Sequence, residues 1–206
     1  MKETPLWYSL LWVTGFIIFK LFFCLKIKGK NKVPKKGGAL IVANHRSYLD
    51  PIVLALLIPR KMNFMAKEEL FHNQAFGYLI TKLGAFPLKR EKMDKRAYLK
   101  ALEVLKEGKI LVLFPEGTRS RSGKLGKLKE GPVRIALSSN VPLIPVVLKG
   151  TEKILPPGAK FIRWGKIKVE VGEPLFSDKL KGEKKEKIKV LLQKLKESMI
   201  AMGANE

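Results

Sequence analysis

The sequence predicts an α/β protein, in which a single domain with a central mixed β-sheet flanked by helices follows an N-terminal apolar membrane-anchoring helix. From about residue 37 onward, short apolar runs rich in β-branched residues alternate with helical stretches, as in α/β domains. An apolar segment of about twenty residues precedes them, and no internal repeat or low-complexity linker divides the rest. We therefore predict a membrane anchor and basic linker over residues 1–36 and an α/β domain over residues 37–206.

The apolar segment over residues 6–25 reads LWYSLLWVTGFIIFKLFFCL. As a helix it would be roughly 30 Å long, enough to span a bilayer, whereas ending it at Lys20 leaves ~14 residues, which suits insertion into one leaflet. Trp7, Tyr8 and Trp12 favour a membrane interface near its start. The segment is followed by Lys26, Lys28, Lys30, Lys32, Lys35 and Lys36. This lysine excess predicts an inner (cytoplasmic) membrane location with the domain facing the cytoplasm, and the lack of a small-x-small site disfavours a cleaved signal peptide.

The strands and helices of the domain follow from hydrophobic periodicity and from the turn residues between periodic segments. We predict strands near residues 38–43, 62–66, 85–88, 110–114, 143–149 and 166–171. We predict helices near residues 51–58, 67–82, 94–107 and 130–139. The tail from Ser177 mixes apolar residues with many lysines, which is typical of a basic amphipathic helix. Such a helix packs on the domain, which is the default expectation, or contacts a membrane.

The composition is strongly basic, with 41 Lys and Arg against 18 Asp and Glu, a net charge of +23 and a pI near 10.1. Such a surface attracts polyanions, meaning nucleic acid, anionic lipid headgroups or an acidic carrier protein. The apolar N-terminus and the lack of a recognisable nucleic-acid-binding motif disfavour nucleic acid. The single cysteine, Cys24, excludes an intramolecular disulfide, and no cluster of His, Cys and carboxylates has metal-ligand spacing, so no metal or cofactor is expected.

A histidine and an aspartate five residues apart follow the first predicted strand of the domain, in the stretch Asn44-His45-Arg46-Ser47-Tyr48-Leu49-Asp50-Pro51. His45 would lie at the C-terminal end of that strand, where open α/β sheets bind ligands, and Asp50 would cap the helix that Pro51 begins. The short loop can return His45 to the Asp50 carboxylate, which leaves the second imidazole nitrogen able to take a proton. The alternative to a catalytic pair is that this stretch is an ordinary helix start in a polar loop. The other histidine, His72, has no carboxylate partner at a comparable spacing.

Two further stretches place basic residues after predicted strands. Residues 114–123 read FPEGTRSRSG, whose glycines let the backbone approach a ligand and whose arginines offer a planar fork that matches a phosphate. A solvated basic loop is the alternative, and the spacing is not that of a P-loop. Residues 84–90 read GAFPLKR, a strand that ends in a basic pair and is a weak signal on its own.

Taken together, NHRSYLD, GAFPLKR, FPEGTRS and VPLIPVVLKG (residues 141–150) resemble, in order and spacing, the four sequence blocks of the glycerolipid acyltransferases. The likeness is strongest to bacterial 1-acylglycerol-3-phosphate acyltransferases and covers roughly residues 38–150. It implies that His45 and Asp50 are the catalytic pair, that Pro145 supports the acyl pocket and that Lys67 is a candidate for stabilising the oxyanion. The resemblance further implies a glycerol-phosphate site formed by Arg90, Glu116, Gly117, Thr118 and Arg119.

The same resemblance implies transfer of a fatty acyl group from a thioester, either acyl coenzyme A or acyl carrier protein, to lysophosphatidic acid at an anionic membrane surface. The product would be phosphatidic acid, with His45 as the general base. Because the sequence has no Gly-x-Ser-x-Gly elbow and its only cysteine lies in the anchor, direct transfer without an acyl-enzyme is expected. The alternatives are another glycerol-phosphate or lysophospholipid acceptor, or a non-enzymatic protein that binds anionic lipid.

Overall fold

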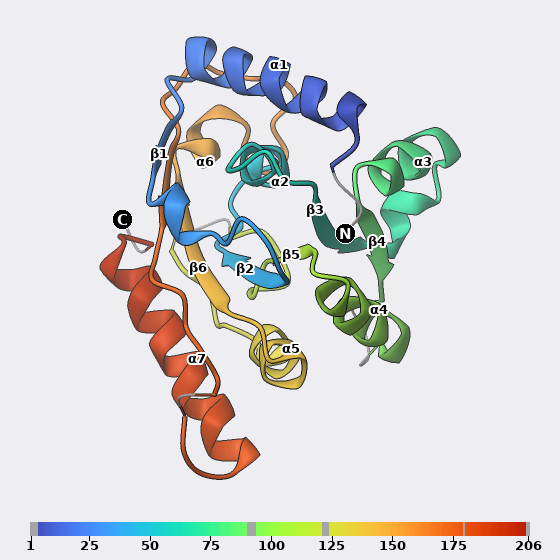
Figure 1. Ribbon diagram of the computed structural model, residues 1–206. Helices are drawn as coiled ribbons and strands as arrows, with labels where there is room; N and C mark the ends of the chain where they lie inside the picture. The colour runs from blue at the N-terminus through green and yellow to red at the C-terminus, as the bar shows by residue number, and fades with distance from the viewer. Residues whose placement is uncertain (1–3, 90–93, 121–123, 179, 205–206) are drawn as a thin grey trace.

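The computed structural model describes residues 4–89, 94–120, 124–178 and 180–204. Within these residues the centre is a seven-stranded sheet with the order β1-β7-β6-β2-β5-β3-β4 (Figure 1). Its strands are β1 Lys26–Lys28, β2 Ala39–Ala43, β3 Met62–Lys67, β4 Ala85–Leu88, β5 Ile110–Leu113, β6 Leu143–Lys149 and β7 Lys168–Val171. All neighbouring strands are parallel except β6 and β7, which are antiparallel. The predicted mixed sheet is therefore confirmed.

Helices cover both faces of the sheet. They are α1 Leu6–Phe22, α2 Asp50–Ala55, α3 Gln74–Lys82, α4 Lys95–Lys106, α5 Gly131–Ser139, α6 Thr151–Ile154 and α7 Lys184–Ala201, with 3-10 turns η1 Lys30–Lys32 and η2 Glu68–Phe71. Helices α2 and α6 lie on one face with α1 across them, whereas α4, α5 and α7 lie on the other (Figure 1). Strand β2 is buried throughout, because Ala39, Ile41 and Ala43 join one core and Leu40 and Val42 the other.

The predicted helix over residues 67–82 is divided into two elements. Lys67 ends β3, and η2 precedes a polar break in which the Asn73 side chain accepts a hydrogen bond from the Phe76 N–H at 3.0 Å. Asn73 therefore caps a new helix, α3. A short amide side chain is favoured at a helix cap, where it satisfies a free N–H of the first turn, and is disfavoured inside a helix.

The N-terminal segment belongs partly to the domain. Residues 26–36, predicted to be a linker, contain the edge strand β1, in which Ile27 pairs with Val169 of β7. Tyr8, Phe19 and Leu25 are buried, so one side of α1 and the residue before β1 contribute to the core. Helix α1 has 17 residues. In the described part of the chain, no helix combines the length and apolar character needed to cross a membrane.

The C-terminal tail forms the predicted amphipathic helix, α7. Its residues Ile188, Leu191, Leu195 and Met199 are buried in the same core as α4 and α5. A spacing of three or four residues brings these side chains to one side of the helix. The default expectation, that this helix packs on the domain, is confirmed.

The turn between β6 and α6 depends on glycine at position 150. Gly150 has a φ of +93°, and a Cβ there would collide with the main-chain carbonyl of Lys166. We expect Gly150→Ala to lower the free energy of unfolding by more than about 2 kcal/mol, since a forced backbone shift adds to the cost of a left-handed φ. Gly37→Ala is the matched control, because Gly37 has a φ of +81° but open space around it. Urea denaturation measures both variants, and equal losses of unfolding free energy in Gly150→Ala and Gly37→Ala would contradict the predicted collision.

Candidate active site

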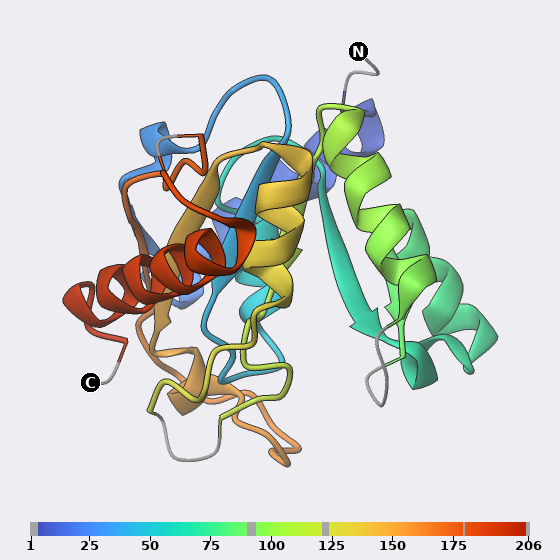
Figure 2. The ribbon, with the colours of Figure 1, turned by 90° about the horizontal axis from the view of Figure 1, so that it is seen from below.

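The candidate active site lies where two neighbouring parallel strands end. Strand β2 ends at Ala43 and continues into Asn44 to Asp50, and the adjacent β5 ends at Leu113 and continues into Phe114 to Ser120. Figure 2 shows the loops after β5 and after α6 at one edge of the sheet. This is the C-terminal edge, where open α/β sheets place their ligands.

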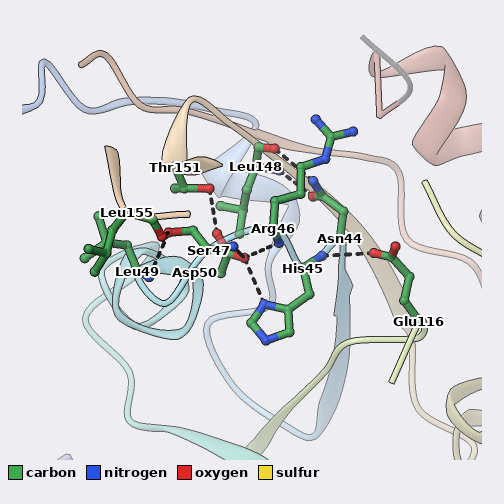
Figure 3. Close-up of polar contacts among 10 residues, drawn as sticks. All are labelled: Asn44, His45, Arg46, Ser47, Leu49, Asp50, Glu116, Leu148, Thr151 and Leu155. Carbon is green, nitrogen blue, oxygen red and sulfur yellow. Dashed lines mark hydrogen bonds and ion pairs between the residues drawn. The ribbon is translucent and has the colours of Figure 1, made fainter. Parts of the chain in front are cut away.

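A buried carboxylate organises the loop after β2. Asp50 is fully buried, and its Oδ2 lies 2.8 Å from Nδ1 of His45 (Figure 3). The same oxygen accepts hydrogen bonds from the main-chain N–H groups of Arg46 at 2.6 Å and Ser47 at 2.8 Å. Its other oxygen, Oδ1, accepts the hydroxyl of Thr151 at 2.6 Å. Because these oxygens act as acceptors, a neutral His45 ring carries its proton on Nδ1 and its lone pair on Nε2.

The predicted helix cap at Asp50 was wrong by one residue. Asp50 is the first residue of α2, Leu49 precedes the helix, and Pro51 lies in its first turn. The Asp50 carboxylate points back to the loop rather than to the N–H groups of the helix. The Arg46 and Ser47 residues are buried, so their main-chain N–H groups require an acceptor inside the protein. The Asp50 carboxylate is that acceptor.

The loop after β5 fixes the position of His45 from the other side. Glu116 Oε1 accepts the main-chain N–H of His45 at 3.0 Å, and Ser120 donates its N–H to the His45 carbonyl at 2.8 Å. The imidazole stacks on Phe114, with ring centroids 3.9 Å apart and planes 16° from parallel. The His45 side chain is only 13% exposed, so its main chain and ring are both held in one orientation.

Three polar side chains of the loop after β2 connect it to the rest of the domain. The Asn44 amide donates to the Leu148 carbonyl at 2.9 Å and accepts the Leu148 N–H at 2.7 Å, which joins the end of β2 to β6. The Ser47 hydroxyl donates to the carbonyl of Leu155, after α6, at 2.6 Å. The side chain of Arg46 is buried and donates to the carbonyl of Ala204 near the C-terminus.

Four residues of the predicted glycerol-phosphate site, Glu116 to Arg119, lie on the loop after β5. The guanidinium of Arg119 stacks on the Tyr48 ring at 3.8 Å, which fixes a planar cation beside the His45 loop. Thr118 is exposed. Gly117 has a φ of +74°, and a Cβ there would lie 2.8 Å from Nζ of Lys129.

Glu116 has a different role from the phosphate contact that the resemblance implies. Its Oε1 holds His45 and its Oε2 accepts the Gly126 N–H at 2.8 Å, so both oxygens bind main-chain donors. A carboxylate in this role positions the two loops and presents no donor to a phosphate.

The other predicted residues in the described part of the chain, Lys67 and Pro145, make contacts that do not involve His45. Lys67 is half exposed at the end of β3, and its ammonium lies 2.6 Å from Glu69, whose pKa is lowered chiefly by the hydrogen bond from Lys67. Pro145 is buried inside β6, opposite Val42 of β2, and so supports the sheet. Arg90 lies outside the described residues.

Phe114 and Thr151 are site residues that the sequence analysis did not single out. Both follow strands next to β2, Phe114 directly after β5 and Thr151 two residues after β6. Because parallel neighbours end at the same edge, an aromatic ring and a hydroxyl at these positions were a usable signal. Among the described residues, no three of the His, Cys, Asp and Glu side chains are grouped so that they could hold a metal.

The family follows from comparison with known proteins. The family model described as Acyltransferase matches residues 24–149, which is more than half of the chain. The chain belongs to the Acyltransferase family. The predicted resemblance to the glycerolipid acyltransferases is thereby confirmed, and the match runs from just before β1 to the end of β6.

Several relatives of this chain are named 1-acyl-sn-glycerol-3-phosphate acyltransferase. The 1-acyl-sn-glycerol-3-phosphate acyltransferase of Bacillus subtilis is 34% identical over 160 residues, which cover 77% of this chain and 77% of that protein. The chloroplastic enzyme LPAT1 of Arabidopsis thaliana is 34% identical over 164 residues, 77% of this chain and 45% of that protein. The chain thus spans about half the length of the plant relatives it matches.

A solved acyltransferase shares the fold. The crystal structure of the 1-acyl-sn-glycerophosphate (LPA) acyltransferase PlsC from Thermotoga maritima matches with a TM-score of 0.75 at 30% identity. The match covers 92% of this chain and 78% of that one.

Replacing Thr151 with valine keeps the side-chain shape but removes the hydroxyl that donates to Asp50 Oδ1. We expect the free energy of unfolding to fall by about 1–3 kcal/mol, because a buried carboxylate oxygen loses its donor. Urea denaturation measures this loss, and Thr151→Ser, which keeps the hydroxyl, should lose less. A valine variant as stable as the serine variant would show that this bond contributes nothing.

Proposed function

We propose that this protein transfers a fatty acyl group from a thioester donor to the free hydroxyl of 1-acylglycerol-3-phosphate, making phosphatidic acid. The observation that carries the proposal is the buried Asp50 carboxylate on Nδ1 of His45 at the C-terminal edge of the sheet. The names of the relatives from Bacillus subtilis and Thermotoga maritima support lysophosphatidic acid as the acceptor.

The chemistry needs a base and an orienting carboxylate. Nε2 of His45 takes the proton of the acceptor hydroxyl as its oxygen attacks the thioester carbonyl. The resulting tetrahedral oxyanion collapses with loss of the thiolate, which recovers the proton from the imidazolium as the free thiol. Asp50 stabilises the imidazolium and holds the ring orientation, and the stack on Phe114 prevents the ring from turning away. The acyl group passes directly to the acceptor, so no covalent acyl-enzyme forms.

Arg119 binds the phosphate of the acceptor. Its guanidinium already lies on the Tyr48 ring, so little side-chain freedom is lost when a phosphate binds. Arg119 lies one residue before Ser120, whose N–H binds the His45 carbonyl. A phosphate held there keeps the rest of the acceptor close to the base. Arg90 is the second phosphate ligand that the family resemblance implies.

Helix α1 attaches the protein to the inner membrane, with the domain on the cytoplasmic side. One side of α1 packs on the domain, and the other exposes Leu6 (89%), Leu10 (69%) and Leu21 (70%). A helix of this kind lies in the bilayer interface rather than across it. The net charge of +23 attracts anionic lipids and either donor, because coenzyme A is polyanionic and carrier proteins are acidic.

His45→Ala tests the reaction. We expect kcat to fall by about 10²–10⁴-fold, which is the usual contribution of a positioned base. The assay follows phosphatidic acid formed from lysophosphatidic acid with acyl coenzyme A or acyl carrier protein, and it includes glycerol 3-phosphate and lysophosphatidylcholine as competing acceptors. His72→Ala, at the only other histidine, is the control and should keep wild-type activity. A His45→Ala enzyme within a few-fold of wild type, at unchanged Tm, would exclude His45 as the base.

Arg119→Lys separates phosphate recognition from general basicity. The change keeps the charge but removes the planar fork and its stack on Tyr48, so we expect kcat/KM for lysophosphatidic acid to fall by about tenfold or more. Steady-state kinetics at fixed ionic strength and saturating donor measure the change. Lys127→Ala, on the same loop, removes a full charge and should do much less. Equal losses would mean that the loop attracts anions without a defined phosphate site.

The attachment through α1 is tested by Leu10→Ser combined with Leu21→Ser. Both side chains are exposed, so the fold should tolerate the change while the apolar area available to lipid shrinks. We expect flotation with anionic vesicles at high salt to fall by about tenfold or more. A double serine variant at Leu79 and Leu99, which are 53% and 63% exposed on α3 and α4, should float as wild type does. Wild-type flotation of the α1 variant would place the attachment elsewhere.

A further inference from the structure

The connection between α6 and β7 exposes an apolar cluster that the sequence blocks do not include. Phe161, Ile162 and Trp164 are 81%, 60% and 79% exposed, which is unusual for side chains of this size. They alternate with or adjoin three exposed cations, Lys160, Arg163 and Lys166. We call residues 160–166 the α6–β7 loop.

The α6–β7 loop is held in a defined conformation. The Arg163 N–H donates to the Ile154 carbonyl at 2.9 Å, and Gly165 lies against the Ile154 side chain. Just after the loop, Ile167 is fully buried and donates its N–H to the Phe23 carbonyl at 2.9 Å. The exposed apolar side chains therefore belong to a segment whose main chain is tied to the domain.

The exposed cluster is continuous with the outer side of α1. The Trp164 ring lies 6.0 Å from the ring of Phe22, the last residue of α1, which is itself 52% exposed. In Figure 1 the chain after α6 passes beside α1, and in Figure 2 it protrudes from the same edge of the sheet as the loop after β5. Aromatic and aliphatic side chains flanked by Lys and Arg match the layered chemistry of a lipid surface, with acyl chains below anionic headgroups.

We propose that the α6–β7 loop is a second membrane-insertion element, in which Phe161, Ile162 and Trp164 enter the acyl region of an anionic leaflet. Lys160, Arg163 and Lys166 bind the headgroups. This inference rests on the proposed attachment of α1 to the same membrane. A second contact beside the C-terminal end of α1 widens the attachment and limits rotation of the domain about the helix axis, which α1 alone would leave free. Arg163 of the loop binds the carbonyl of Ile154, and the carbonyl of the next residue, Leu155, accepts the Ser47 hydroxyl, so the contact links the His45 loop to the leaflet.

Trp164 serves as the reporter of insertion. A full-length Trp7→Phe, Trp12→Phe variant keeps Trp164 as its only tryptophan. With vesicles of phosphatidylglycerol and phosphatidylcholine whose acyl chains are brominated, we expect a blue shift and strong quenching of Trp164. Unquenched Trp164 in vesicle-bound protein overturns the proposal and would indicate a water-facing or protein-binding loop.

A loop variant with serine at Phe161, Ile162 and Trp164 measures the contribution of the cluster. We expect its partitioning into these vesicles at high salt to fall by about tenfold or more. The matched control carries serine at Tyr78, Leu79 and Leu99, three side chains that are 53–66% exposed on α3 and α4, and should partition as wild type does. Equal partitioning of the two variants also overturns the proposal. Quenching is independent of acyl transfer, so quenching without phosphatidic acid formation would refute the proposed reaction alone.

Discussion

The buried carboxylate of Asp50 is the constraint on which the site depends. It accepts four hydrogen bonds, from the His45 ring, two main-chain N–H groups and Thr151, while lying entirely out of solvent. Removing an ion from water costs several kcal/mol, and only well-placed donors offset that cost. The loop after β2 must therefore keep one conformation, because any other would leave a buried charge without its donors. The position of His45 follows from what stabilises Asp50.

A second carboxylate has the complementary role. Glu116 is held by two main-chain N–H groups, one from His45 and one from Gly126, and so joins two loops that are distant in sequence. Asp50 fixes the His45 ring, and Glu116 fixes the His45 main chain. In a chain of net charge +23, these two acidic side chains hold the His45 ring and main chain in place. All four carboxylate oxygens accept hydrogen bonds from within the protein, so under the proposed function neither carboxylate turns an unpartnered oxygen toward the phosphate.

The strands of the domain were predictable because their side chains alternate or form buried runs, as Ala39 to Ala43 do. The His45–Asp50 contact was also predictable, since a short loop between a strand end and a helix start can return His45 to the Asp50 carboxylate. Strand β1 was not, because three residues with a single apolar side chain, Ile27, carry no periodic signal and pair only through β7, far along the chain. Thr151 lies just after a predicted strand, which was a usable signal, but its partner Asp50 is 101 residues away, and only the register of β6 beside β2 brings the two together. Asn73 is a residue type that commonly caps helices, which indicated a helix start at this position. The apolar residues around it nevertheless favoured the prediction of one long helix.

The short helix α6 connects the site with the surface proposed to face lipid. Its first residue, Thr151, binds Asp50, and the carbonyl of Leu155 directly after it accepts both the Ser47 hydroxyl and the Tyr48 N–H. A displacement of α6 would break these three bonds together, at a cost of several kcal/mol, since each contributes about 1 kcal/mol or more. In the proposed attachment, contact of the α6–β7 loop with a leaflet is therefore passed to the His45 loop through a helix end that three hydrogen bonds join to it.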